Sequence, residues 1–289
     1  YQDINNLKVL KSKINLVKPS IIFHLAAQPL VIESFKKPLN TFNTNIIGTA
    51  NLLEISKNIK SLKSIVIITT DKVYKVRNNK NFFSEQDELG GNDPYSASKV
   101  GTEIIVNSYI QSFFSKTKLK NRISTARSGN VIGGGDYSKN RLVPDIIESH
   151  NKKKELVIRN PKNIRPWQHV IEPLIGYILL AQKQISKKIN SNACWNFGPN
   201  RNNFLKVDDV VNIFKKLINF NVKTSNTNKF PETKILKLNN NKSLRKLKWI
   251  PKWNIDIASE KVTEWNKLKK KKVNVRNICE MQVRSYFKD

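Results

Sequence analysis

Short runs rich in apolar residues alternate with stretches of helical periodicity along the first half of this chain. The runs are residues 20–27, 64–70 and 123–127, and apolar residues recur at helical spacing over 39–57 and 95–114. Strands that are apolar at every position are buried on both faces, which is typical of a parallel sheet covered by helices. The pattern therefore predicts an α/β fold with a doubly wound parallel sheet.

The second half of the chain is less regular. It shows helical patterns and short strand-like segments at 142–150, 155–159, 170–184, 207–220 and 254–268. We expect three parts: a first domain over residues 1–141, a smaller α+β lobe over 142–268 with some segments returning to the sheet, and a basic, mobile tail over 269–289.

The start of the chain lacks a feature of dinucleotide-binding sheets. Such a sheet opens with a strand and a glycine-rich turn, which seats a pyrophosphate at a helix N-terminus. No such turn precedes Ile21, and the glycines Gly133, Gly134 and Gly135 follow a later strand. We therefore expect that about two βα units are missing from this sequence.

The chain carries 52 basic and 22 acidic residues, a formal net charge of +30. Ten of the basic residues are arginine, and the lysines are spread along the chain except for the run at 269–272. Nucleic-acid-binding proteins usually cluster their charge and combine it with arginines or stacking aromatic residues. The charge thus favours a lysine-rich surface, and a nucleic-acid-binding protein is the alternative from a different class.

Two cysteines, Cys194 and Cys279, are too few for a disulfide framework. This number favours a reducing cytoplasm. No apolar run reaches the roughly 18 residues that a membrane helix needs, and no signal-peptide pattern opens the chain. We expect a cytoplasmic globular protein without a membrane partner.

Tyr95 and Lys99 are four residues apart in a predicted helix. This spacing places the phenol and the ammonium on one face, one turn apart. A nearby ammonium favours the phenolate, because opposite charges stabilise each other's ionised forms. Such a tyrosine can remove a proton from a hydroxyl group while a hydride leaves the same carbon.

Thr69, Thr70, Asp71 and Lys72 lie at the carboxyl end of the second apolar run. Ligands of open α/β sheets bind at the carboxyl ends of the strands. Hydroxyl, carboxylate and amine groups in succession at such a place supply a hydrogen-bond donor, an acid and a base. The sequence therefore predicts that this strand end and the Tyr95–Lys99 helix form one site.

These segments resemble the extended short-chain dehydrogenases/reductases, and among them the CDP-glucose branch of the nucleotide-sugar 4,6-dehydratases. The resemblance implies a Rossmann-like sheet with incomplete N-terminal βα units and a smaller substrate lobe. It extends from about residue 20 to about 268, and its strings lie at residues 23–31, 44–49, 70–72, 93–99, 127–136, 141–147, 158–161, 164–170 and 195–200.

The resemblance also implies a mechanism. With NAD bound, Tyr95 is the base at the sugar C4 hydroxyl, Lys99 is its electrostatic partner and Thr70 holds that hydroxyl. Asp71 resembles the acid that protonates the leaving C6 hydroxyl. In the dTDP-glucose and GDP-mannose enzymes a glutamate follows this aspartate as the base at C5. Here Lys72 stands there, and a lysine base needs a lowered pKa, so the identity of the C5 base is open.

The resemblance further implies binding residues for NAD and for CDP-glucose, and no metal. The residues expected to contact NAD are Leu25, Ala26, Ala27, Asn45, Thr69, Tyr95, Lys99 and Ser128. The residues expected to contact the nucleotide sugar are Asn130, Arg141, Arg165 and Asn196. Among these, Arg165 and Asn196 resemble the groups that hold the diphosphate. His24, His169, Trp167, Trp195 and Cys194 are interpreted as structural residues.

Three alternatives to this function remain open, and so does the expected oligomeric state. The Thr-Asp-Lys string also occurs in inverting UDP-N-acetylglucosamine 4,6-dehydratases, and another nucleotide-sugar dehydratase or epimerase is a further possibility. A chain without the phosphate-binding turn is expected to bind NAD poorly and to be inactive. The resemblance also implies a homodimer through the helices at 39–57 and 95–114, and a role in deoxysugar synthesis for a polysaccharide.

Overall fold

The computed structural model describes residues 2–76, 82–189, 194–225 and 237–288, which form two compact units. The first unit is Tyr1–Ser128, Ile175–Phe197 and Asn239–Trp249, and the second is Gly129–Leu174, Gly198–Leu238 and Ile250–Asp289. The chain leaves the first unit at Ser128 rather than at the predicted residue 141. The reason is that the strand beginning at Asn130 pairs within the second unit.

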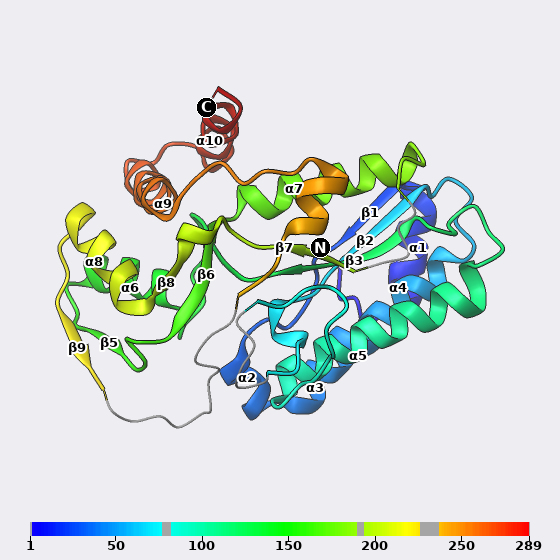
Figure 1. Ribbon diagram of the computed structural model, residues 1–289, viewed down its shortest axis with the longest axis horizontal. Helices are drawn as coiled ribbons and strands as arrows, with labels where there is room; N and C mark the ends of the chain where they lie inside the picture. Colours follow the sequence, from blue (N-terminus) through cyan, green and yellow to red (C-terminus); the bar gives the residue numbers. More distant parts are fainter. Residues whose placement is uncertain (1, 77–81, 190–193, 226–236, 289) are drawn as a thin grey trace. The chain divides into compact units, whose positions relative to one another are not determined.

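The first unit is built on a parallel sheet of four strands in the order β1-β2-β3-β7 (Figure 1). Side chains of successive strand residues point to opposite faces. Accordingly, Ile65 and Ile67 of β2 join one hydrophobic core and Val66 joins the other. The predicted α/β fold with a parallel sheet is confirmed. The strands are β1 (Ile21–His24), β2 (Ser64–Ile68), β3 (Ile123–Ser128) and β7 (Trp195–Phe197).

β1 departs from the prediction that every strand is buried on both faces. All residues of β3 are buried, whereas Ile21 and Phe23 of β1 are each 37% exposed. Among the described residues β1 pairs with β2 on one side. Its other edge has no described neighbour, so part of its apolar surface is uncovered.

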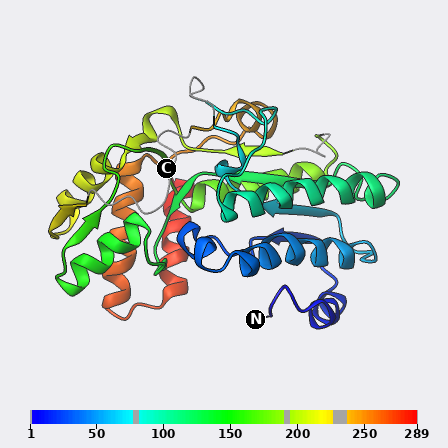
Figure 2. The same ribbon diagram turned by 90° about the horizontal axis from the view of Figure 1, so that it is seen from below.

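Helices cover both faces of this sheet. Leu53 of α4 and Val106 of α5 pack on one face, and Tyr177 and Leu180 of α7 pack on the other. Figure 2 shows α5 alongside α3 and α4. The helices are α1 (Leu7–Val17), α2 (Val31–Lys36), α3 (Pro38–Phe42), α4 (Gly48–Ser56), α5 (Pro94–Tyr109) and α7 (Ile171–Ile185), which begins in the second unit. In the part of the chain that the structure describes, no helix is long and apolar enough to cross a membrane.

The two long predicted helices of the first unit are confirmed, each with a π-helical turn. The helix predicted over 39–57 contains the π-helical turn Asn43–Ile47 between α3 and α4. The helix predicted over 95–114 ends in the π-helical turn Ile110–Phe114 after α5. By contrast, the sequence pattern did not predict α1.

The second unit combines helices with two small sheets. β4 (Asn130–Ile132), β6 (Ile164–His169) and β8 (Phe204–Lys206) form a mixed sheet, and β5 (Leu156–Ile158) pairs with β9 (Val222–Thr224). Their apolar side chains share one core with those of the helices. The helices are α6 (Leu142–Lys152), α8 (Val207–Leu217), α9 (Ile255–Lys270) and α10 (Val275–Lys288).

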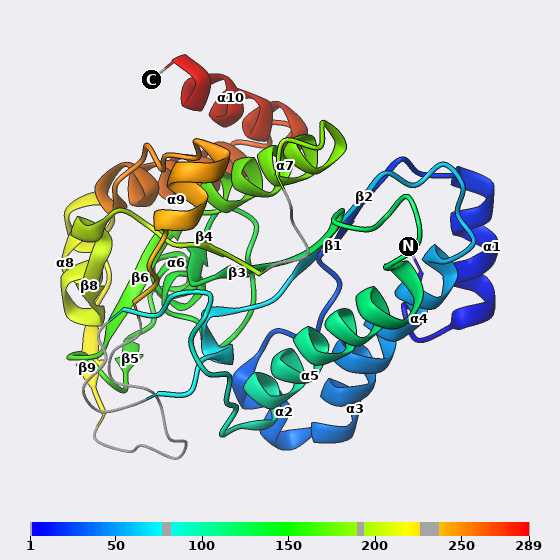
Figure 3. The ribbon, with the colours of Figure 1, turned by 45° about the vertical axis from the view of Figure 1, so that its right-hand side comes forward.

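The prediction of a mobile tail after residue 268 is wrong. α9 continues to Lys270, and α10 packs beside it (Figure 3). Ile278, Gln282 and Tyr286 of α10 recur at four-residue intervals and are buried, as expected for one face of a helix. The Tyr286 hydroxyl donates to Glu172 Oε2 at 2.6 Å.

The triple-glycine loop packs against an aromatic side chain of its own unit. A Cβ atom on Gly134 would overlap the indole of Trp265, and Gly135 has a φ of +82°. L residues with side chains rarely adopt that φ value. The glycines therefore permit a close approach of the loop to α9.

We expect Gly134→Ala to destabilise the protein by about 1–3 kcal/mol, because an overpacked core forces side chains or backbone to shift. The free energy of unfolding in urea measures the effect. Gly133→Ala is the control, since its Cβ would meet a methyl group of Val170 rather than an indole ring. Equal stability of the two variants would contradict the packing explanation.

Candidate active site

The N-terminus of α5 fixes the position of the Tyr-Lys pair. Asp93 caps the helix by accepting a hydrogen bond from the Ser96 backbone N at 2.9 Å, and Pro94 occupies the first turn. Both are preferred residues at these positions. Tyr95 and Lys99 follow on one helix face, with exposed fractions of 8% and 5%.

The Lys99 side chain points at the sheet. Its Nζ donates to the backbone oxygen of Ile68, the last residue of β2, at 3.0 Å. Burial lowers the pKa of Lys99 from 10.5 to about 8, while the Glu103 carboxylate acts in the opposite direction. Burial has this effect because a low-dielectric surrounding disfavours the charged amine. Lys99, the predicted electrostatic partner of Tyr95, is thus a buried amine whose pKa is about 8.

Thr70, Asp71 and Lys72 lie at the carboxyl end of β2, where Asp71–Val73 form a 3₁₀ turn. The Thr70 hydroxyl donates to Asp71 Oδ1 at 3.1 Å and accepts from the Lys72 backbone N at 3.3 Å. Thr70 and Asp71 are buried, and Lys72 is half-buried. α5 packs against this turn, so the structure brings the predicted catalytic residues to one edge of the sheet.

The loop after β1 is held by Asn45. Leu25 is 51% exposed at the end of the strand, and Ala26 and Ala27 follow it. The buried Asn45 amide accepts from the Gln28 backbone N at 2.8 Å and donates to the Gln28 oxygen at 3.1 Å and to Ser98 Oγ at 2.8 Å. Both of its N–H groups are used, so Asn45 positions the predicted NAD loop against α5.

Two further residues predicted to contact NAD are engaged within the first unit. The Thr69 hydroxyl donates to Glu103 Oε1 at 2.7 Å. Ser128, at the end of β3, is buried and hydrogen-bonded to Tyr177. Burial raises the pKa of Tyr177, so its hydroxyl keeps its proton. Both residues lie at the same edge of the sheet as Thr70.

The predicted phosphate contact of Asn196 does not fit this structure. Its side chain is fully buried, and its amide donates to the backbone oxygens of Phe83 and Asn239 at 2.9 and 3.1 Å. Its Oδ1 accepts from the Tyr74 hydroxyl at 2.6 Å. With both N–H groups committed, Asn196 joins three segments of the first unit and offers no donor to a diphosphate.

Three buried polar residues of this site escaped the sequence analysis: Glu103, Arg127 and Tyr74. Glu103 and Arg127 form an ion pair with side chains 7% and 3% exposed. Arg127 Nη1 also donates to the Tyr74 hydroxyl at 2.9 Å. Glu103 follows Lys99 by four residues, as Lys99 follows Tyr95, and this repeat was the available signal.

The second unit holds the other predicted substrate residues. Asn130 begins β4, and Arg141 precedes α6 with its Nη1 3.1 Å from Asp136 Oδ2. Arg165 lies on β6, is 8% exposed and donates to the Ile164 oxygen at 3.0 Å. Their predicted contacts with a nucleotide sugar stay predictions.

The histidines and tryptophans interpreted as structural are buried. His24 contacts Thr49 Oγ1 at 2.9 Å, and burial, followed by the charge of Lys99, lowers its pKa to about 3. His169 packs edge-on against Trp253, and burial lowers its pKa to about 4. Both imidazoles are therefore neutral near pH 7, which suits packing residues. Trp167 and Trp195 belong to the hydrophobic cores.

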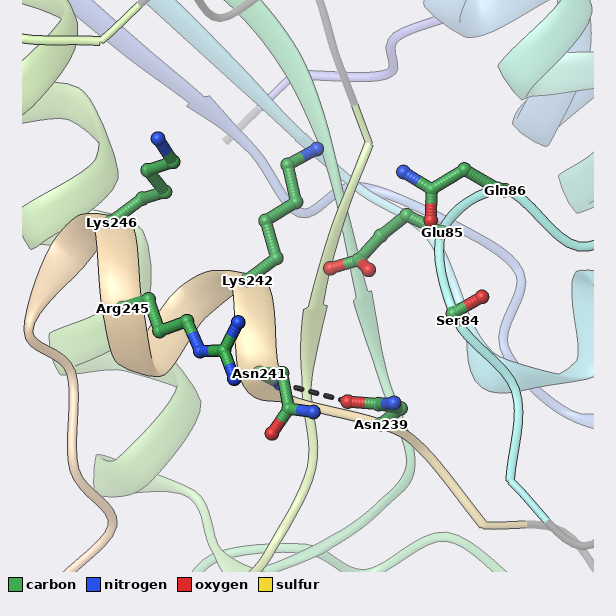
Figure 4. A pocket seen from close by; sticks show the side chains of 8 residues that line it. All are labelled: Ser84, Glu85, Gln86, Asn239, Asn241, Lys242, Arg245 and Lys246. Carbon is green, nitrogen blue, oxygen red and sulfur yellow. Dashed lines mark hydrogen bonds between the residues drawn. The ribbon is translucent and has the colours of Figure 1, made fainter.

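A cavity of about 420 Å³ lies in the first unit (Figure 4). Glu85 Oε1 accepts from the Asn196 backbone N at 2.9 Å, and Lys242 Nζ donates to the Cys194 oxygen at 2.6 Å. Burial raises the pKa of Glu85 and lowers that of Lys242. The lining residues are Ser84, Glu85, Gln86, Asn239, Asn241, Lys242, Arg245 and Lys246.

Sequence comparison identifies the family. The model of the GDP-mannose 4,6 dehydratase family matches residues 1–264. The chain is 38% identical over 270 residues to CDP-glucose 4,6-dehydratase of Salmonella typhimurium, covering 92% of this chain and 75% of that protein. It is 31% identical to dTDP-D-glucose 4,6-dehydratase of Dictyostelium discoideum, over 63% of this chain and 42% of that protein. The chain belongs to the GDP-mannose 4,6 dehydratase family.

Comparison of structures agrees on the fold. A crystal structure of dTDP-glucose 4,6-dehydratase from Bacillus anthracis in complex with NAD superposes with a TM-score of 0.76. It is 22% identical, and the match covers 92% of this chain and 78% of that one. The two relatives named above are thus nucleotide-sugar 4,6-dehydratases, and this structural neighbour was solved with NAD. The resemblance and the Rossmann-like fold stated from the sequence are confirmed.

The lowered pKa of Lys99 predicts a dependence of stability on pH. Between about pH 8 and 10.5 the unfolded chain keeps a proton on this lysine that the folded chain has lost. Stability therefore rises with pH over this window. Relative to Lys99→Met, the free energy of unfolding of the unchanged protein should increase across it by up to about 3 kcal/mol.

The test is urea unfolding of both proteins at a series of pH values. The difference between the two cancels the groups that titrate in both. A difference that stays flat across the window would show that Lys99 keeps its ordinary pKa in the fold.

Proposed function

We propose that this chain dehydrates CDP-glucose to CDP-4-keto-6-deoxyglucose with NAD as cofactor. The observation that carries the proposal is the 38% identity to the Salmonella CDP-glucose enzyme over 92% of the chain. The site supports it, because a buried Tyr-Lys helix face and the Thr-Asp-Lys strand end lie at one edge of the sheet.

The residues at this edge suit the nicotinamide half of NAD. Tyr95 and Lys99 supply a phenol and an amine on one helix face, and the ends of β1, β2 and β3 lie beside each other. The exposed Leu25 gives this edge an apolar surface. In our proposal Leu25, Ala26, Ala27, Thr69 and Ser128 line the cofactor, and Lys99 holds its ribose. NAD, when bound, supplies the acceptor for the hydride from the sugar C4.

Proton movement at C4 is assigned to α5. Tyr95 takes the proton of the C4 hydroxyl as the C4 hydride leaves, and the Thr70 hydroxyl holds that oxygen by a hydrogen bond. Before this transfer Tyr95 is a phenolate, which the protonated Lys99 stabilises. Because Lys99 has a pKa of about 8, we expect this help to weaken as the pH rises above that value.

Elimination across C5 and C6 is assigned to the turn after β2. Asp71 gives a proton to the C6 hydroxyl, which leaves as water, and a base removes the C5 proton. Lys72 stands next to Asp71 and is half-buried, so we propose it as this base. The hydride would return to C6 and a proton to C5, so the sum of the steps is loss of one water molecule from the sugar.

Substrate binding is assigned to the second unit. We propose that Asn130 contacts the sugar and that Arg141 and Arg165 face the nucleotide diphosphate. The guanidinium fork of an arginine suits two phosphate oxygens at once. Arg165 is held on β6 between β4 and β8, so its backbone position is rigid.

Purified protein with added NAD should convert CDP-glucose to a 4-keto product. The product is detected by its absorbance in alkali and by mass spectrometry as a loss of one water. UDP-N-acetylglucosamine is the competing substrate, because Thr-Asp-Lys occurs in its inverting dehydratases as well. Turnover of UDP-N-acetylglucosamine in place of CDP-glucose would overturn the proposed specificity.

Tyr95→Phe should lower kcat roughly 10²- to 10⁴-fold, the usual contribution of a general base, while the protein stays folded. Tyr109→Phe is the matched control. Tyr109 lies on the same helix, and its hydroxyl contacts Glu54 at 3.2 Å, away from the sheet edge. If Tyr95→Phe keeps full activity, the assignment of Tyr95 as the base at C4 is wrong.

We also propose a homodimer through the two long helices of the first unit. Exposed apolar side chains lie on both: Leu39 (77%), Ile47 (50%), Ile104 (61%) and Phe113 (48%). Burying such side chains against a second copy is favourable, at roughly 25 cal/mol per Å². Their presence on both helices fits a bundle of four helices.

Ile104→Glu should therefore shift the protein from dimer to monomer in light scattering coupled to gel filtration. Ile178→Glu is the control, because Ile178 is 53% exposed on α7, outside both helices. A monomeric unchanged protein, or equal behaviour of the two variants, would contradict the proposed interface.

A further inference from the structure

Glu103 lies on the same face of α5 as Tyr95 and Lys99, one turn beyond the lysine. Successive four-residue steps keep side chains on one side of a helix. Glu103 is 8% exposed, the same fraction as Tyr95. A buried carboxylate beside the predicted catalytic pair has no part in the mechanism assigned above, so its role is open.

The Glu103 carboxylate receives four hydrogen bonds. Thr69 Oγ1 and Arg127 Nε donate to Oε1 at 2.7 and 2.9 Å, and Thr125 Oγ1 and Arg127 Nη2 donate to Oε2 at 2.7 and 3.1 Å. Bidentate pairs of this kind are strong and fix geometry. Since Thr69 follows β2 and the others lie on β3, Glu103 joins α5 to both strands.

Lys99 and Glu103 form hydrogen bonds with adjacent residues at the end of β2. Lys99 Nζ holds the backbone oxygen of Ile68, and Glu103 holds the hydroxyl of Thr69. Thr70 and Asp71 are the next residues along the chain. Two consecutive turns of α5 therefore hold two consecutive residues at the end of β2. These contacts fix the position of α5, which carries Tyr95, relative to the predicted catalytic turn.

Arg127 is committed to this arrangement. Two of its nitrogens donate to Glu103, and a third donates to the Tyr74 hydroxyl at 2.9 Å. The guanidinium also lies 4.9 Å from the centre of the Tyr74 ring. It is thus the counter-ion of Glu103, fixed from a second side by Tyr74.

The charges round Lys99 come from several elements. Glu103 raises the pKa of Lys99 against the larger effect of burial, and Lys99 in turn lowers the pKa of the neutral His24. The titratable groups on the elements packed here include Tyr95 and Glu103 on α5, His24 on β1, Asp71 and Lys72 after β2 and Arg127 on β3.

We propose that Glu103 is a positioning residue of the 4,6-dehydratase site: with Arg127 as counter-ion, it fixes α5 against the end of β2 and keeps the Lys99 ammonium charged beside Tyr95. The inference rests on the proposed function for its catalytic meaning. Its physical content, a charge coupling between Glu103 and Lys99, can be measured without NAD or substrate.

The variant Glu103→Gln keeps the shape of the side chain and removes its charge. The matched control is Glu172→Gln, because Glu172 is a fully buried glutamate of the second unit that accepts from the Lys252 and Trp253 backbones and from Tyr286. Both changes remove a buried, hydrogen-bonded carboxylate. General loss of stability should therefore appear in both variants.

The discriminating readout is the pH at which Lys99 contributes to stability. In the unchanged protein, the difference in unfolding free energy from Lys99→Met begins to rise near pH 8. Loss of the Glu103 charge disfavours the Lys99 ammonium, so in the Glu103→Gln background the rise should begin at least about half a pH unit lower. In the Glu172→Gln background it should begin where it does in the unchanged protein. An unshifted onset in Glu103→Gln would overturn the proposal.

If Glu103→Gln alone is too unstable, because it leaves the Arg127 guanidinium buried without a partner, the double variant Glu103→Gln with Arg127→Met replaces it. A smaller downward shift of the onset is expected there, because loss of the Arg127 cation partly offsets loss of the Glu103 anion. With an active unchanged enzyme, kcat on CDP-glucose should fall at least roughly tenfold and KM should change little. A changed KM with an unchanged kcat would oppose the proposal. An inactive unchanged enzyme would refute the proposed function, and the titration would then decide the role of Glu103.

Discussion

Two opposite charges, the carboxylate of Glu103 and the guanidinium of Arg127, lie 2.9 Å apart inside the first unit. Taking them out of water is unfavourable unless each finds close partners. Here Thr69, Thr125 and Tyr74 complete those partners. Because these residues belong to α5, to β3 and to the segment after β2, the pair finds its partners in this arrangement of the three. The candidate site depends on that arrangement.

The residues with catalytic assignments lie around this fixed point. Burial lowers the pKa of Lys99 to about 8. The amine therefore changes between its charged and neutral forms near that pH. Asp93 caps α5 and Pro94 is its first residue, so Tyr95 lies in the first turn at the same edge of the sheet. Thr70 and Asp71 follow directly on the strand end that Lys99 and Glu103 hold. Rigid elements thus carry each group, which favours a preorganised site.

Two amides and two glycines with sequence signatures make contacts within their own units. Asn45 and Asn196 resembled cofactor and phosphate contacts, yet each spends its amide on backbone and side-chain partners of the first unit. Gly134 and Gly135 are part of a loop that lies against Trp265. A sequence string marks a family position, but the hydrogen bonds that a residue makes decide whether it is free to bind a ligand.

The sequence by itself determined the parallel sheet, the long helices and the position of the Tyr-Lys pair. These follow from local periodicity, a capping residue and a four-residue spacing, which depend on neighbours along the chain. It missed α1 and α10, where scattered lysines and asparagines obscured the apolar repeat. Tertiary structure alone decided that Glu103 pairs with Arg127, that β1 is partly uncovered and that the chain changes unit at Ser128. Such features depend on which distant segments become neighbours, and burial then gives a charge or an amide its partner.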